Sequence, residues 1–221
     1  MLELIQPISK RDQVVRAMKD AILSGTIEPG ASIVESKIAQ QLGAGVPLIR
    51  EALIELEHQG FVQRTPYKGT TVTKLSPADV KRIFALRVEL EALAIEWAKD
   101  HTTQADLDFL RQNIRKMEEA AKMLDLPQFY ESDLAFHRKI WSLSDNQYLV
   151  DALERLVVPL FAFFVMKTSR QQKSYEESAC MHAKIVEALP VKSAVELREM
   201  FTKYLSSWKD DMVTLLFPEE K

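Results

Sequence analysis

The sequence of 221 residues predicts a mainly α-helical protein. A small N-terminal domain of three helices and a β-hairpin is expected to precede a larger, all-helical domain. Two observations predict this. Up to residue 74, short helical stretches are separated by glycine-containing turns and end in two strand-like segments. From residue 75 onward, apolar residues recur at helical spacing with only short interruptions. We therefore expect one domain over residues 1–74 and another over 75–221.

The first helix is predicted from Ser9 to Leu23. Serine is a residue type that caps helix N-termini, and an apolar stripe follows it at helical spacing. Ser24-Gly25 ends this helix, and Glu28-Pro29-Gly30 forms a turn. A short extended piece is expected at Ile33-Val34.

Two further helices and a hairpin complete the first domain. The second helix is expected from about Glu35 to Leu42, where Gly43 ends it, and the third from about Pro47 to Gln59, because glycine ends helices and proline suits a first turn. Strands are expected over 61–64 and 69–74, with a tight loop between them. This order is that of a winged helix-turn-helix. The expected core residues on its second and third helices are Leu42, Ile49, Leu53 and Leu56.

Six helices are predicted in the second domain. Ser76 and Pro77 begin the first of them, which is expected to extend to about Ala98. Along it, apolar residues repeat at helical spacing at Ile83, Leu86, Leu90, Leu93, Ala94 and Trp97. The other helices are expected at 103–123, 127–143, 147–170, 174–189 and 192–216, with a kink at Pro159. Short loops between them predict an antiparallel bundle.

Composition excludes several classes of protein. No apolar run approaches the roughly 20 residues that a membrane span needs, and no secretory leader is predicted. Cys180 is the single cysteine, so no disulfide framework is expected. These features predict a cytoplasmic protein without a membrane partner. Residues 1–74 hold nine Lys/Arg against eight Asp/Glu, so charge alone does not indicate nucleic-acid binding.

The order of short motifs in both domains resembles a known family. The N-terminal signals are Ser24-Gly25, Pro29-Gly30, Glu35, Leu42-Gly43, Arg50-Glu51-Ala52-Leu53, Leu56, Gly60 and Gly69. The C-terminal signals are the segment from Asp133 through His137 to Ile140, then Ser144-Asp145-Asn146, and His182. The first set resembles the DNA-binding domain of the GntR family of bacterial transcription regulators. The second resembles the effector domain of its FadR-like (FCD) branch.

The resemblance implies a ligand-responsive transcription regulator rather than an enzyme. It implies a homodimer that binds a palindromic double-stranded DNA operator, and a repressor that a small carboxylate releases. A second hypothesis is a metabolite- or metal-binding helical sensor whose DNA-binding head is degenerate. An enzyme is the third, but no dedicated general base or activated nucleophile is evident beside the candidate metal ligands.

The resemblance also implies a DNA-contacting set of residues in the first domain. This set is Ser36, Gly45, Val46, Pro47, Arg50, Lys68 and Gly69. Arg50 lies one turn inside the recognition helix, where it can reach a phosphate or a guanine edge, and Lys68 lies at the wing tip.

One segment departs from the family pattern. Gly45-Val46-Pro47-Leu48 stands where the family usually has Ser/Thr-Arg-Thr-Pro, so valine replaces the expected arginine. The loss of one bidentate arginine–guanine contact costs about 1–3 kcal/mol of discrimination. We expect a weakened or altered operator preference, in which Val46 can instead contact a thymine methyl group.

A second constellation lies in the helical domain. Asp133 and His137 are i,i+4 on one helix, and an antiparallel bundle can bring His182 opposite them. A carboxylate and two imidazoles suit a divalent transition metal. The resemblance implies that these three are ligands of a zinc- or nickel-type ion. Tyr204 stands where the family has a fourth ligand, a histidine. Either a three-ligand site binds the ion, or the pocket binds an organic effector without metal.

Arg87 matches a position where the family often has an arginine that faces the effector. It would then pair with a carboxylate. The alternative is a helix-surface salt bridge with Glu91 at i,i+4. The expected effector-binding residues are Arg87, Asp133, His137, His182 and Tyr204. The aromatic residues Trp141, Phe161, Phe163 and Phe164 are expected in core or dimer packing rather than at the ligand.

Overall fold

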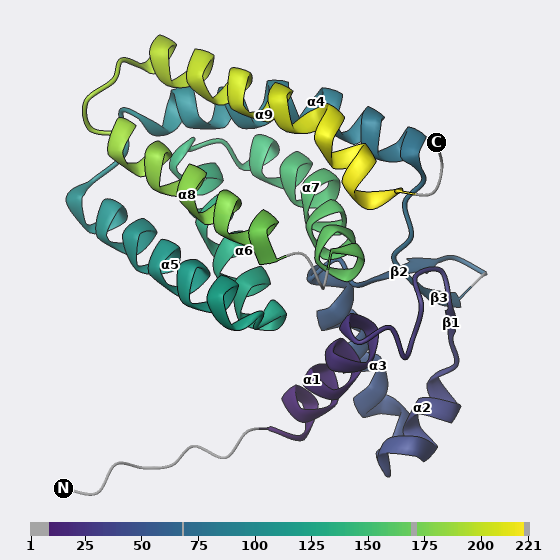
Figure 1. Ribbon diagram of the computed structural model, residues 1–221. Helices are drawn as coiled ribbons and strands as arrows, with labels where there is room; N and C mark the ends of the chain where they lie inside the picture. The colour runs from purple at the N-terminus through teal and green to yellow at the C-terminus, as the bar shows by residue number, and fades with distance from the viewer. Residues whose placement is uncertain (1–8, 68, 169–171, 219–221) are drawn as a thin grey trace, which may run out of the picture. The chain divides into compact units, whose positions relative to one another are not determined.

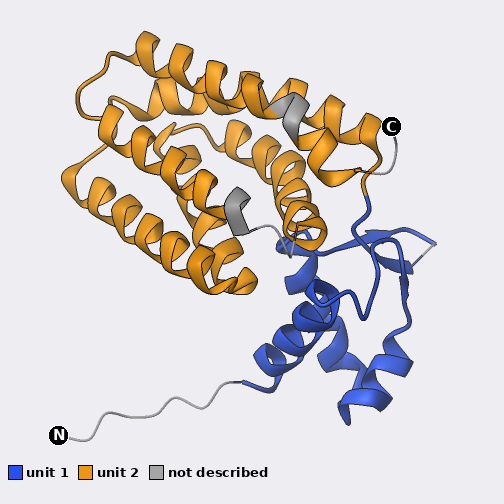
Figure 2. Ribbon diagram, viewed as in Figure 1, with its two compact units in different colours: residues 1–74 blue, residues 75–221 orange. Residues whose placement is uncertain are grey.

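The computed structural model describes residues 9–67, 69–168 and 172–218. The chain divides into two compact units, residues 1–74 and 75–221 (Figure 2). Each unit has its own core and is described by itself. No described helix combines the length and the apolar character that crossing a bilayer requires.

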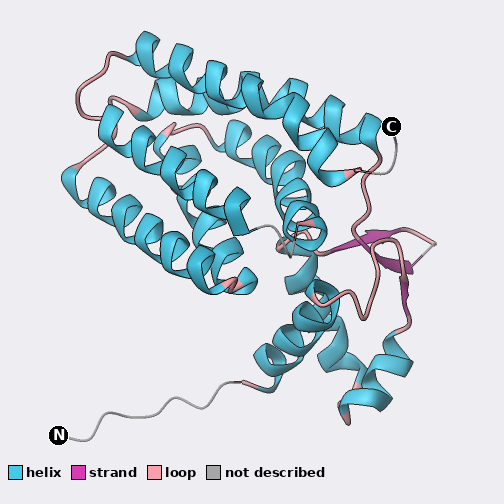
Figure 3. Cartoon of the chain, viewed as in Figure 1, coloured by secondary structure: helices cyan, strands magenta, loops and turns pink. Residues whose placement is uncertain are grey.

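The first unit contains three helices and a small antiparallel sheet (Figures 1 and 3). The helices are α1 (Lys10–Leu23), α2 (Glu35–Leu42) and α3 (Val46–His58), and the strands are β1 (Ser32–Ile33), β2 (Val62–Thr65) and β3 (Gly69–Val72). The strand order is β1-β3-β2, with Val62 opposite Val72 and Ser32 opposite Thr71. The predicted winged helix-turn-helix is therefore confirmed, and the expected extended piece forms a third strand of the wing.

Local signals in the sequence account for the ends of these helices. Ser9 accepts a hydrogen bond from the amide of Asp12 and caps α1, as predicted. Gly43 ends α2 in the left-handed conformation, with φ +60°. Helix α3 begins one residue earlier than predicted, at Val46. Its N-cap residue is Gly45, which has no side chain to bond the first amides.

The core of the first unit contains most of the predicted residues. Ile49, Leu53 and Leu56 are fully buried. The prediction for Leu42 is wrong, because its side chain is 41% exposed. Leu42 is the last residue of α2 and lines an open hollow beside α1, whereas Ala39, one turn earlier, is buried.

The second unit is a bundle of helices, as predicted (Figure 1). They are α4 (Pro77–Ala98), α5 (Gln104–Met123), α6 (Leu126–Leu143), α7 (Gln147–Lys167), α8 (Gln172–Ala188) and α9 (Ala194–Leu216). Helix α4 packs along α9, and α5 packs beside α6 and α8. Pro159 lies inside α7, which continues past it to Lys167.

The apolar repeat of α4 predicted the helix correctly, but most of its residues lie outside the buried face. Leu86 is 55% exposed and Trp97 is 37% exposed, while Ile83, Leu90 and Leu93 are only partly buried. Of this repeat, only Ala94 is buried. The buried face instead consists of Val80, Phe84, Arg87, Val88, Glu91, Ala92, Ala94, Ile95 and Ala98. Two of these buried residues, Arg87 and Glu91, are charged. The buried face is therefore less apolar than expected, and the more regular apolar repeat lies on another face of the helix.

Candidate functional site

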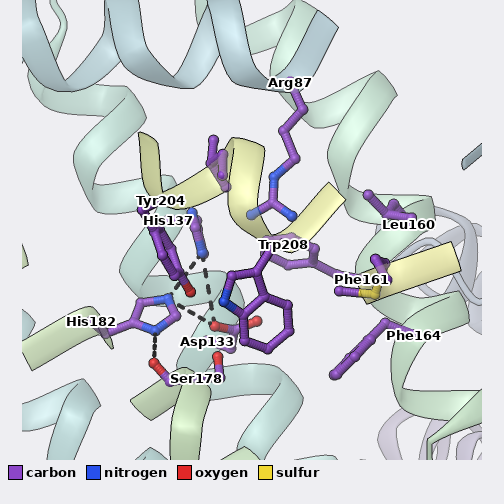
Figure 4. Close-up of a pocket in the computed structure, with 12 residues that line it drawn as sticks. Arg87, Asp133, His137, Leu160, Phe161, Phe164, Ser178, His182, Tyr204 and Trp208 are labelled. Atoms are coloured by element: carbon purple, nitrogen blue, oxygen red, sulfur yellow. Dashed lines mark hydrogen bonds and ion pairs between the residues drawn. The ribbon is translucent and has the colours of Figure 1, made fainter. Parts of the chain in front are cut away.

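The second unit contains a small cavity that five helices line (Figure 4). The cavity has a volume of ≈ 40 Å³, enough for a few water molecules. Its walls are formed by Arg87, Asp133, His137, Leu160, Phe161, Phe164, Ser178, His182, Tyr204, Leu205, Trp208 and Met212. All five residues that the sequence assigned to effector binding therefore line this one cavity.

The cluster of three candidate metal ligands lies at one side of the cavity. Asp133 and His137 come from α6, one helical turn apart, and His182 comes from α8. Nε2 of His182 lies 3.0 Å from Nε2 of His137 and 3.1 Å from Oδ1 of Asp133. The third separation, from His137 Nε2 to Asp133 Oδ1, is 3.8 Å. One donor atom from each residue therefore points at a shared space, as Figure 4 shows.

Hydrogen bonds on the far side of each ring fix which nitrogen faces that space. Nδ1 of His137 lies 2.7 Å from the carboxylate of Glu91, and Nδ1 of His182 lies 2.7 Å from the carbonyl oxygen of Ser178. Both partners can only accept, so both Nδ1 atoms carry the proton. The two Nε2 atoms therefore face each other across 3.0 Å, where they can share one proton in a hydrogen bond or together bind a cation.

Asp133 adds a negative charge to this cluster. Its Oδ1 atom is buried and lies 3.1 Å from Nε2 of His182, close enough to accept a hydrogen bond when that nitrogen carries a proton. Burial alone would raise the pKa of Asp133, but the neighbouring His182 and His137 outweigh it and hold the pKa below its ordinary value. An ionised oxygen and two imidazole lone pairs thus converge, and this donor set fits a divalent transition metal.

A buried network on α4 supports the cluster. Glu91 is 1% exposed and accepts three hydrogen bonds: from Arg87 Nε at 2.6 Å, His137 Nδ1 at 2.7 Å and Trp141 Nε1 at 2.9 Å. Burial alone would raise the pKa of Glu91, but Arg87 and His137 hold it far below its ordinary value. The predicted Arg87–Glu91 pair is present, but it is buried rather than on the helix surface. Glu91 was not among the site residues predicted from the sequence.

Residues of α7 and α9 close the cavity. Tyr204 reaches it from α9, and burial raises the pKa of its phenol, which therefore stays neutral. Trp208 lies one turn further along α9, in edge contact with Tyr204. Phe161 and Phe164 of α7 also line the cavity, and Phe161 is buried, as expected of a core residue. Phe163 and Trp141 are buried, as expected of core residues.

A groove in the first unit gathers most of the predicted DNA-contacting residues. Ser36, Val46, Arg50 and Gly69 line it. The groove lies between the N-terminal ends of α2 and α3 and the wing. Val46 is half-buried in the first turn of α3, next to the exposed N-cap Gly45 and the exposed Pro47.

Charged and aromatic side chains occupy the rim of this groove. Arg50 is exposed and pairs with Glu35 of α2, with Nε to Oε2 at 2.6 Å. Lys68 lies outside the described residues. Arg64 and the fully exposed Tyr67 line the wing side of the groove, although neither was predicted from the sequence to contact DNA. A cation and an aromatic residue within the predicted hairpin were the available signals.

Two protein families match this chain. Residues 82–207 match the FCD domain family, and residues 10–72 match the family described as "Bacterial regulatory proteins, gntR family". Together these matches cover both units.

Curated proteins with similar sequences are regulators by name. The chain is 29% identical over 145 residues to the uncharacterized HTH-type transcriptional regulator YdhC of Bacillus subtilis, covering 65% of each chain. It is 28% identical over 146 residues to the HTH-type transcriptional regulator McbR of Escherichia coli, covering 66% of each. The match to a probable D-xylose utilization operon transcriptional repressor of Paenarthrobacter nicotinovorans is 28% over 168 residues, covering 76% of this chain and 73% of the relative. The chain thus spans about two thirds of the length of the first two relatives.

Solved structures share the fold. E. coli McbR/YncC superposes with a TM-score of 0.70 at 23% identity, covering 97% of this chain and 100% of that chain. A putative GntR regulator from Rhodococcus sp. RHA1 superposes with a TM-score of 0.68 at 19% identity, covering 93% and 98%. At these identities the superpositions show the fold alone.

Proposed function

The chain belongs to the gntR family of bacterial regulatory proteins and carries an FCD domain, and from this premise we propose that it is a ligand-responsive transcription regulator. The first unit binds a palindromic operator, and the second binds a small carboxylate together with a divalent metal ion. The protein acts as a repressor, and the ligand releases it from DNA by binding two states of the protein unequally. The observation that carries this proposal is the buried donor cluster beside Arg87.

The donor cluster supports metal binding. Two lone pairs and one carboxylate oxygen converge within a buried space, and each histidine is oriented by a second hydrogen bond. Such outer partners are typical of metal-binding histidines. Asp133, His137 and His182 would hold a zinc- or nickel-type ion, and Tyr204, a neutral phenol, would not be a ligand. The ion supplies positive charge next to the cavity.

Arg87 supports a carboxylate as the ligand. Glu91 accepts a hydrogen bond from Nε of Arg87, and the rest of the guanidinium group lines the cavity (Figure 4). Faces of the Phe84 and Phe161 rings hold the guanidinium carbon at 5.3 and 4.7 Å from their centroids. A guanidinium group fixed in this way presents two terminal nitrogens, which match the two oxygens of a carboxylate.

The groove of the first unit supports DNA binding. The first turn of α3 has no side-chain cap, and uncapped backbone amides at a helix N-terminus bind phosphate. Arg50 lies on the same rim, where its exposed guanidinium group can leave Glu35 for DNA. Half-buried Val46 offers a methyl surface that suits thymine.

Gel-shift experiments test the DNA-binding proposal. The full chain, saturated with Zn²⁺ or Ni²⁺, should form a complex with DNA from upstream of its own locus, and that complex should weaken steeply as salt increases. The Arg50→Ala variant should bind about tenfold or more weakly, because one guanidinium contact is lost. Arg115→Ala, at an exposed position of α5, is the matched control and should bind as the unmodified chain does. Absence of any specific complex at low salt would contradict the proposal.

Val46 favours a second candidate function, a sensor whose DNA-binding head is degenerate. The two candidates differ in the effect of Val46→Arg. If the head is degenerate, this variant binds DNA where the natural chain does not. If the head is functional, both proteins bind, and the variant prefers a different operator sequence in a selection from random DNA.

The outward stripe of α4 supports a homodimer. Five apolar side chains recur along one face at positions 83, 86, 90, 93 and 97, and none of them is buried. A monomer rarely leaves so long an apolar strip exposed, and a second copy could cover it with the same strip. The proposed dimer would bring two DNA-binding heads to the two halves of a palindrome.

Charge introduced into the stripe tests the homodimer. Leu86→Glu should convert the protein from dimer to monomer in light scattering after size exclusion, because a carboxylate cannot be buried in an apolar interface without a partner. Ala85→Glu makes a comparable change at the adjacent exposed position, outside the stripe, and should leave the dimer intact. A Leu86→Glu protein that remains dimeric would place the interface elsewhere.

A further inference from the structure

The two sides of the groove in the first unit carry different chemistry. On the helix side, the side chain of Val46 has no polar group, and Arg50 is already paired with Glu35 at 2.6 Å. On the wing side, Arg64 of β2 is exposed, and none of the described carboxylates forms an ion pair with its guanidinium group. Among the described residues that line the groove, the cation that can bind DNA without first breaking an ion pair therefore lies on the wing.

The strand that carries Arg64 is held against α3. The backbone amide of Arg64 donates a hydrogen bond to the carboxylate of Glu57 at 3.3 Å, and Arg64 lies opposite the buried Thr70 in the pairing of β2 with β3. The backbone at Arg64 is therefore fixed relative to α3. A side chain that reads a base needs such a fixed position, because a displacement of about 1 Å loses the contact.

Tyr67, near the tip of the wing, is unfavourable in the free protein in two respects. Its side chain is fully exposed, and its backbone is left-handed, with φ +64°. A bulky residue rarely adopts this conformation, and strained residues of this kind cluster at functional sites. An aromatic ring in water also gains free energy when a partner covers it. Both features are expected of a residue that contacts a ligand along this groove.

The position of the wing relative to α3 favours a contact with the minor groove of DNA. In the proposed complex, the first turn of α3 faces the major groove and the phosphates at its edge, and the wing lies across the protein groove from that turn. Crossing one phosphate strand leads from the major groove to the adjacent minor groove, which is about 6 Å wide and admits side chains rather than a helix. Where A·T pairs narrow the minor groove, its negative potential attracts arginine.

We propose that the wing, rather than α3, supplies most of the sequence preference of this protein, and that it reads A·T pairs in the minor groove. Arg64 donates hydrogen bonds to the N3 and O2 acceptors of these pairs, and the N2 amino group of a G·C pair excludes it. Tyr67 packs against the sugars that wall the same groove and positions Arg64 without reading sequence. This assignment rests on the proposed DNA-binding function and specifies which residues determine the operator.

Base analogues test which groove is read. A preferred operator is selected from random DNA with the full chain, and each A·T pair of that operator is then replaced, one at a time, by G·C or by inosine·cytosine. Inosine·cytosine has the acceptors of A·T in the minor groove but the pattern of G·C in the major groove. At the pair where G·C has the largest effect, we expect G·C to weaken binding about tenfold and inosine·cytosine to bind about as tightly as A·T. Equal weakening by both replacements there would show readout through the major groove and overturn the proposal.

Two variants test the roles of the two residues. Arg64→Gln should reduce the preference for A·T over G·C from about tenfold to about threefold or less, whereas loss of a phosphate contact would weaken binding to every sequence equally. Tyr67→Ala should weaken binding to all sequences about fivefold and leave the preference unchanged. The matched controls are Arg115→Gln of α5 and Tyr148→Ala of α7, both at exposed positions, and they should change neither quantity. An Arg64→Gln protein with the full preference, or a Tyr67→Ala protein with unchanged affinity, would contradict the assignment.

The outcomes separate this inference from the proposed function. If the selection yields no bound sequence, the DNA-binding proposal fails, and this inference fails with it. If a sequence is selected but is read through the major groove, the DNA-binding proposal stands and this inference alone fails.

Discussion

Replacement of Glu91 by alanine is expected to lower the free energy of unfolding of the metal-free protein by about 3–5 kcal/mol. The carboxylate accepts hydrogen bonds from Arg87, His137 and Trp141, all in the interior. Its removal leaves a buried guanidinium charge without its partner and two buried N–H groups without acceptors. Each of these groups loses water on folding and gains nothing in return. Urea denaturation, followed by circular dichroism, measures the loss.

A second ion pair on α4 provides the control for this prediction. Glu96 pairs with Arg198 of α9 at 2.6 Å, but both side chains are partly exposed to solvent, at 25% and 41%. Glu96→Ala should therefore cost at most about 1 kcal/mol, as surface ion pairs usually do. Glu91→Gln should fall between the two alanine variants, because the amide keeps one acceptor and loses the charge. If Glu91→Ala costs no more than Glu96→Ala, the buried network does not stabilise the fold as we infer.

The elements of the fold were predictable because their signals are local. Ser9, Gly43 and Ser76 define helix ends through their own backbone and side-chain preferences. The pairing of β1 with β3 was not predictable in the same way. Ser32–Ile33 is too short to show an alternating pattern, and its partner strand lies nearly 40 residues later in the chain.

Helix α4 shows where apolar periodicity fails. Leu86, Leu90 and Leu93 repeat at helical spacing and correctly predict a helix. Periodicity cannot tell a core from an interface between subunits, because both are apolar stripes. The buried face holds Arg87 and Glu91, whose charges satisfy each other and His137. That face can be buried only because Arg87, Glu91 and His137 contact one another in the folded protein.

Part of the candidate site was predictable from residue spacing along one helix. The i,i+4 spacing of Asp133 and His137 placed both on one face, and the bundle supplied His182 from α8. The tautomers depended on contacts that spacing does not reveal, such as the carbonyl oxygen of Ser178. That Phe161 and Phe164 also line the cavity was not predictable, because their spacing on α7 is that of core residues.

Replacement of Asp133 by asparagine is expected to affect the metal-loaded protein and the metal-free protein differently. In the loaded protein, the change removes a charged ligand, so metal content should fall from one ion per chain to near zero. A ligand at a hundred times its dissociation constant stabilises the folded state by about 2.7 kcal/mol, and this gain should disappear. Elemental analysis and denaturation with and without Zn²⁺ measure both effects.

In the metal-free protein, the same change should destabilise the fold only slightly. The lowered pKa of Asp133 means that folding favours its ionised form, but the asparagine amide can donate to Nε2 of His182, 3.1 Å from Oδ1, and so offsets part of the loss. Asp100→Asn, the same change at an exposed position, should alter neither metal content nor stability. A variant destabilised equally with and without Zn²⁺ would show that Asp133 supports the fold rather than a metal ion. The difference between the losses with and without Zn²⁺ therefore distinguishes a structural carboxylate from one held in place for a cation.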